Sequence, residues 1–170
     1  EIKSTNADDI YAIHIDLNLG EYSKKCRAAC EKVCEENNIP LFVYGLAKEK
    51  DPSFFRVDSS VQSNSKKISN CSVCGVVKKW ILNREARRLN ASVIVTGHNI
   101  DDEAQTFLMN ILKGSPELSS NTGPKSKNVS DKKFISRAKP LYYHSEEDIL
   151  KYSKLKKLPV VYEKCPYSGN

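Results

Sequence analysis

The feature that most constrains this chain is the alternation of short apolar runs with longer stretches of helical composition. The apolar runs have the length and side chains of buried strands, and they lie at residues 10–17, 41–46 and 91–96. Helices are predicted at residues 21–37, 77–89 and 103–113, and from Ser145 onward. A short last strand is predicted at residues 159–162. Strands that alternate with helices predict an α/β fold with a Rossmann-like, mostly parallel sheet covered by helices on both faces.

Two polar segments rich in Ser, Lys and Asn interrupt this pattern, and we expect both to be long loops. They lie at residues 48–70, leading into a pair of cysteines, and at residues 114–136. Ligands of such folds bind beyond the carboxyl ends of the strands, and long loops often carry function. No repeat or clear boundary divides the sequence, so we expect a single domain over residues 1–170.

The charge of the chain is positive and unevenly distributed. The 170 residues include 27 Lys and Arg against 21 Asp and Glu, a net charge of +6. The excess is concentrated in residues 125–139 and 151–157. Clustered positive charge is the electrostatic pattern of a nucleic-acid partner, although surface lysines also keep proteins soluble. No run approaches the about 20 apolar residues that cross a membrane, and no export signal precedes the first strand, so we expect a cytoplasmic protein.

Six cysteines occur in three settings. Cys26, Cys30 and Cys34 recur on one face of a predicted helix, and we interpret them as small core residues. Cys71 and Cys74 form a Cys-x-x-Cys motif, in which Gly75 would ease a turn. Such a motif in the cytoplasm is compatible with a metal or iron–sulfur site, with thiol redox chemistry or with chance.

Other residues of the sequence bear on whether the Cys-x-x-Cys motif binds a metal, binds an iron–sulfur cluster or carries out redox chemistry, but they do not decide between these alternatives. Lys78 and Lys79 would favour thiolates over thiols. A structural zinc site needs four ligands, and the sequence has no second such motif. Cys165, after the predicted last strand, could supply a third thiolate. Three protein ligands would leave one iron of a cluster open to an exogenous ligand.

Residues 96–103 join a predicted strand to a predicted helix through Gly97 and His98. A strand, a turn and a helix N-terminus form a natural anion site. Asp101 and Asp102 would repel a bare phosphate, but either can cap the helix, and together they can hold magnesium. His98 is compatible with a ligand, a base or a hydrogen-bonded turn residue. The helix that follows has an apolar stripe of Ala104, Phe107, Leu108 and Ile111.

The ordered set of motifs resembles the tRNA 2-thiolation enzymes of the PP-loop ATP pyrophosphatase superfamily, in particular the archaeal and thermophile type of tRNA uridine 2-sulfurtransferase. The resemblance covers nearly the whole chain. It rests on segments at residues 15–17, 21–23, 71–75 with Lys78, 96–99, 101–104, 114–118, 139–141 and 165–168.

The resemblance implies the adenine nucleotide alpha-hydrolase fold and a specific reaction. ATP, bound with Mg²⁺, would adenylate the C2 oxygen of a tRNA uridine, and sulfur would then replace that oxygen as AMP leaves. The resemblance implies a 4Fe–4S cluster on Cys71, Cys74 and Cys165, whose fourth iron can carry the sulfur. It assigns catalytic roles to Lys78 and Asp102. It also implies contacts to adenine by the strand at His14 and Ile15, and contacts along the nucleotide by Gly97 and His98.

The resemblance also implies partners and flanking parts. The partners are tRNA, a sulfur donor that is either sulfide or a thiocarboxylated ubiquitin-like carrier, and a second copy in a homodimer; no membrane is implied. Family members carry a glycine- and serine-rich pyrophosphate loop before the strand that matches residues 10–17, and zinc modules at the N-terminus and usually after the last motif. This sequence contains neither, so we expect a fragment that binds ATP poorly or not at all.

Three other hypotheses remain open from the sequence. The first is cytidine thiolation by a sibling of the same superfamily. The second is a non-catalytic RNA-binding or cluster-carrying protein, and the third is a zinc-stabilised or thiol-redox domain.

Overall fold

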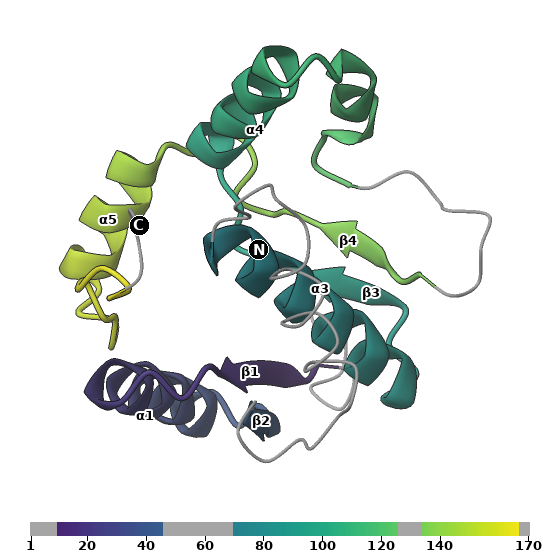
Figure 1. Cartoon of the computed structure of the whole chain (residues 1–170). Coiled ribbons are helices and arrows are strands. Elements are labelled where there is room, and N and C mark those ends of the chain that lie inside the picture. Colours follow the sequence, from purple (N-terminus) through teal and green to yellow (C-terminus); the bar gives the residue numbers. More distant parts are fainter. Residues whose placement is uncertain (1–9, 46–69, 126–133, 167–170) are drawn as a thin grey trace. The chain divides into compact units, whose positions relative to one another are not determined.

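A computed structural model gives the fold and describes residues 10–45, 70–125 and 134–166 (Figure 1). The chain divides into two compact units: residues 1–82 with 158–170, and residues 83–157. The predicted loop at residues 48–70 falls almost entirely outside the described residues. The expectation of a single domain over residues 1–170 stays a prediction.

The first unit contains a β–α–β arrangement. Strand β1 (Ala12–Asp16) pairs in parallel with β2 (Leu41–Gly45), and helix α1 (Glu21–Glu36) connects them and contacts β1. Gly20 precedes α1 with a φ of 61°, a left-handed conformation that glycine adopts without strain. These elements confirm the parallel α/β pattern that the sequence predicts.

Helix α3 (Asn70–Arg88) begins earlier than predicted. The prediction began this helix at Val77 and placed the Cys-x-x-Cys motif at a turn, whereas the structure places the motif inside the first turns of the helix. Gly75 therefore eases no turn; it is a helical residue. Val77 and Ile81, one turn apart, are buried, whereas Trp80 on the same helix is 45% exposed.

The second unit also contains a parallel strand pair. Strand β3 (Val93–Val95) pairs with β4 (Ser136–Ala138), and Ile94, the middle residue of β3, is buried. Strand β4 was not predicted, because Ser-Arg-Ala has little strand character of its own. The remaining elements of this unit are helix α4 (Ile100–Leu112), the short helix η2 (Pro116–Asn121) inside a predicted loop, and helix α5 (Glu146–Leu155).

Two further predictions about elements are wrong. The N-cap of α4 is Asn99, so the helix begins at Ile100, before the predicted Glu103, and neither Asp101 nor Asp102 occupies the cap position. Residues 159–162 form no strand in the described part of the chain. A proline at the first of these positions cannot donate to a sheet, which weakens the case for a strand there.

None of the helices in the described ranges is both long enough and apolar enough to cross a membrane.

Candidate functional site

Helix α3 carries the Cys-x-x-Cys motif and Lys78. Positions 71, 74 and 78 fall within an arc of about 60° around a helix with 3.6 residues per turn. Cys74 is half-buried and Lys78 is exposed, while the side chain of Cys71 lies outside the described residues. The early start of α3 therefore places two cysteine positions and a lysine on one side of a single rigid element.

Cys165 belongs to the same unit as residues 70–82 of α3, in the segment that begins at residue 158. This segment is attached to α1, because Lys25 Nζ donates to Glu163 Oε1 at 2.6 Å. Burial raises the pKa of Tyr22, and its contact with Cys26 and the nearby Cys165 and Glu163 raise it further. Tyr22 thus lies near Cys165, and no spacing in the sequence indicates this proximity.

His14 lies on β1, paired in register with Val43 of β2. Its Nδ1 is 3.5 Å from Cys30 Sγ on α1, and its Nε2 is buried with no hydrogen-bond partner among the described residues. Burial is the main cause that lowers the pKa of His14, with Arg27 adding to it and Asp16 opposing it. Ile15, the next residue, is half-buried and pairs with Tyr44.

Burial also raises the pKa of the Cys30 thiol, with smaller contributions from Cys34 and Cys26. Cys34 itself is buried. A protonated, partly buried thiol is a poor nucleophile and a poor metal ligand. Cys30 and the buried Cys34 are therefore interpreted as packing residues, and the same interpretation of Cys26 stays a prediction.

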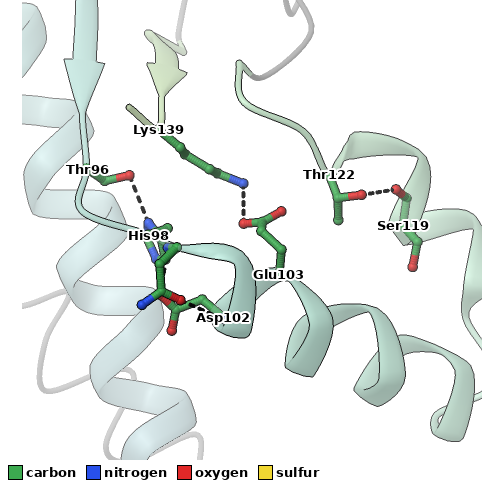
Figure 2. A network of polar contacts seen from close by, with 8 residues as sticks. Thr96, His98, Asp102, Glu103, Ser119, Thr122 and Lys139 are labelled. Atoms are coloured by element: carbon green, nitrogen blue, oxygen red, sulfur yellow. Dashed lines mark hydrogen bonds and ion pairs between the residues drawn. The ribbon is translucent and has the colours of Figure 1, made fainter. Parts of the chain in front are cut away.

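The turn between β3 and α4 belongs to the second unit (Figure 2). His98 Nδ1 lies 2.8 Å from Thr96 Oγ1, and this contact orients the exposed imidazole ring. Gly97 is exposed, and a Cβ added there would meet no atom within 4 Å. The chain itself therefore does not require glycine at position 97, and the space beside it is open to a ligand.

Asp102 completes a capping box at the start of α4. Asn99 Oδ1 accepts from the Asp102 N–H at 2.9 Å, and Asp102 Oδ2 accepts from the Asn99 N–H at 3.1 Å. Asp101 has a different role, because its Oδ2 accepts from the Glu146 N–H of α5 at 2.6 Å. The prediction that this motif caps the start of a helix is confirmed, although the cap residue is Asn99 and not one of the predicted aspartates.

Sequence reasoning missed an ion pair beside this turn. Lys139 Nζ donates to Glu103 Oε1 at 2.6 Å, and the two side chains are only 16% and 11% exposed (Figure 2). Glu103 Oε2 is buried and has no hydrogen-bond partner in the described part of the chain. The residues lie far apart in the sequence, so only the fold reveals that they meet.

The predicted site residues therefore form two groups. The first unit holds His14, Ile15, Cys71, Cys74, Lys78 and Cys165, and the second holds Gly97, His98 and Asp102. Within the described residues, which exclude the Cys71 side chain, no three His, Cys, Asp or Glu side chains are grouped to hold a metal. The three-cysteine site stays a prediction.

The sequence pattern that defines the PP-loop domain matches residues 1–165. The chain belongs to the PP-loop family. This membership confirms the resemblance drawn from the ordered motifs, and it accounts for parallel strands joined by helices.

Two curated relatives of this chain have names that refer to tRNA thiolation. The tRNA 2-thiolation protein NcsA of Haloferax volcanii is 32% identical over 166 residues, which cover 95% of this chain and 51% of that protein. The cytoplasmic tRNA 2-thiolation protein 1 of Caenorhabditis elegans is 34% identical over 163 residues, which cover 95% of this chain and 42% of that protein. The chain thus spans about half the length of the curated relatives it matches or less.

A solved structure similar to this chain has the same fold. It is the U34-tRNA thiolase NcsA from Methanococcus maripaludis with its 4Fe–4S cluster, which superposes with a TM-score of 0.75 at 26% sequence identity. The match covers 95% of this chain and 52% of that one. The fold is therefore of the adenine nucleotide alpha-hydrolase type, as predicted.

Proposed function

We propose that this protein acts in the ATP-dependent 2-thiolation of a tRNA uridine, in the cytoplasm, with a 4Fe–4S cluster on Cys71, Cys74 and Cys165. The observation that carries the proposal is the extension of α3 to Asn70, which places the Cys-x-x-Cys motif and Lys78 on one side of one helix. The names of the relatives, among them a uridine thiolase with its cluster, support uridine over cytidine and enzyme over carrier.

The donor set suits an iron–sulfur cluster. Cysteine thiolates are the usual ligands of such clusters, and all three cysteines belong to the first unit. Cys74 and Cys165 are both half-buried, so the protein could shield a cluster from water and still admit a substrate. The cluster would supply an iron site that holds sulfur as a deprotonated nucleophile.

The chain's own residues would handle ATP and the uridine. The exposed ammonium of Lys78 would stabilise negative charge on the phosphates as the uridine C2 oxygen attacks the α-phosphorus and pyrophosphate leaves. Asp102 is exposed and uses Oδ2 in the capping box, so Oδ1 would be available to Mg²⁺. The edge of β1 at His14 and Ile15 would contact adenine, and the open space at Gly97, beside His98, would admit the nucleotide.

The second half of the reaction replaces oxygen with sulfur. Sulfur from sulfide or from a thiocarboxylated carrier would attack C2 of the adenylated uridine, and AMP would leave with the former C2 oxygen. Adenylation is needed because a carbonyl oxygen is otherwise a poor leaving group.

The test is anaerobic reconstitution with iron and sulfide, followed by iron counting and a visible spectrum. We expect about four irons per chain, and we expect Cys71→Ala, Cys74→Ala and Cys165→Ala each to lose the cluster. Cys26→Ala is the matched control, because it removes a thiol from α1 and should leave the cluster intact. A colourless chain that binds one zinc ion instead would overturn the cluster assignment.

A further inference from the structure

The charges of α5 are segregated along the helix. Glu146, Glu147 and Asp148 occupy the first turn, and lysines follow towards the carboxyl end. Lys151 is neutralised within the helix, since its Nζ lies 2.7 Å from Glu147 Oε1. Lys156 and Lys157, just past the last turn, have no ion-pair partner among the described residues.

Helix α1 offers a comparison for the pairing of charges on α5. It also has several exposed cations, but each of them is paired with a carboxylate: Lys24 with Glu21, Lys25 with Glu163, Arg27 with Glu31 and Lys32 with Glu36. The end of α5 is different, because Lys156 and Lys157 have no paired carboxylate in the ranges that the structure describes. The helix dipole favours a cation at a carboxyl end, but it accounts for only about half a charge.

An aromatic side chain accompanies the lysines. Tyr152 is 58% exposed, and Lys156 Nζ lies 5.9 Å from the centroid of its ring. Leu155 is 82% exposed, whereas Ser153 is buried, so Ser153 marks the side of α5 that faces the protein. Cations, an open ring and an aliphatic side chain therefore lie together on the solvent side of the helix end.

The start of α5 is fixed to the start of α4, beside the turn that carries His98 and Asp102. The Glu146 N–H donates to Asp101 Oδ2 at 2.6 Å, and the Ile100 N–H donates to the His144 carbonyl at 3.1 Å. Helix α5 has 10 residues, so its basic end lies about 15 Å further along. The helix therefore links the proposed nucleotide-binding turn to the basic surface at Lys156 and Lys157.

We propose that the carboxyl end of α5, with Tyr152, Lys156 and Lys157, is an RNA-docking surface. The lysines bind backbone phosphates, and the exposed ring stacks on an unpaired base. The exposed ring of Tyr152 favours RNA over an acidic protein as the partner. Unstacked RNA bases pack on aromatic side chains, whereas an acidic peptide would bind to the lysine charges alone. The proposal rests on the proposed function, which makes tRNA the substrate.

The test measures binding of a labelled tRNA transcript to the whole chain by fluorescence anisotropy at several salt concentrations. In the Lys156→Ala/Lys157→Ala variant we expect the slope of log K against log salt to fall by about 1 for each lysine removed. In Tyr152→Ala we expect about tenfold weaker binding with the slope unchanged. The matched control is Lys24→Ala/Lys32→Ala, which removes the same charge from exposed positions on α1 and should leave the slope nearly as in wild type.

The outcomes separate this inference from the proposed function. An unchanged slope in Lys156→Ala/Lys157→Ala, or a wild-type chain that binds no RNA, overturns the docking surface. Polyglutamate that competes as well as RNA at equal charge concentration also overturns it and assigns the surface to an acidic protein. Cluster assembly is measured on the same samples. If the cluster fails to assemble in a chain whose RNA binding depends on α5, the proposed function is overturned and the docking surface is not.

Discussion

At the scale of single residues, His14 is a group whose protonation is coupled to folding near neutral pH. Burial lowers its pKa below the ordinary value of 6.5, chiefly because the imidazolium loses its hydration. At pH values between 6.5 and the lower folded-state pKa, His14 binds a proton in the unfolded chain but not in the folded chain. The free energy of unfolding therefore falls as the pH drops through this window, and the contribution of His14 becomes constant below the folded-state pKa.

We predict that His14→Gln removes this part of the pH dependence. The measurement is urea unfolding of both proteins between about pH 7.5 and pH 5, a range that brackets the titration of an ordinary histidine. The wild-type free energy of unfolding should fall more steeply than that of the variant over this range. The control is His98→Gln, which changes an exposed histidine. Equal slopes for wild type and His14→Gln would show that His14 does not carry the effect.

At the scale of elements, the sequence predicted which segments are helical better than where the helices begin. The Cys-x-x-Cys-Gly motif has the composition of a turn, so α3 was predicted to begin after it, but a glycine costs a helix only about 1 kcal/mol relative to alanine. Val77 and Ile81 pack into the core and offset such a cost. Strand β4 was missed for a related reason: pairing with β3, rather than the intrinsic preference of Ser136–Ala138, forms this strand.

The helical position of Gly75 gives a prediction at this scale. A Cβ added at Gly75 would meet no atom within 4 Å, so alanine fits without strain. Gly75→Ala should therefore raise the free energy of unfolding by up to about 1 kcal/mol, measured by urea titration of the chain without cluster. Loss of stability would mean that the segment is not helical at this residue.

The ion pair between α4 and the end of β4 gives a second prediction. Glu103→Gln leaves the largely buried ammonium of Lys139 without its counter-charge, so it should destabilise the chain by roughly 3 kcal/mol. Lys139→Met should also destabilise it, and the double variant should cost clearly less than the two single changes together. Urea unfolding of the four proteins forms a double-mutant cycle, and strictly additive effects would show that the two charges do not interact.

At the scale of the whole molecule, the sequence predicted the fold class and the local motifs but not the long-range contacts. The cysteines of α3 and Lys78 could be grouped beforehand because helical spacing relates them directly. Neither the proximity of Tyr22 to Cys165 nor the pair of Glu103 with Lys139 follows from spacing, since tertiary packing brings these residues together. Contacts of that kind need the folded chain.

Helix α4 has a consequence for the behaviour of the protein in concentrated solution. None of its residues is buried, and its large apolar side chains are about half exposed or more: Phe107, Leu108, Met109, Ile111 and Leu112. Exposed apolar area promotes association, and sulfate strengthens that association by its exclusion from protein surfaces. The net charge of +6 opposes it by mutual repulsion, which is strongest when little salt is present. Buffers of low ionic strength should therefore keep the chain dispersed, and ammonium sulfate should precipitate it early.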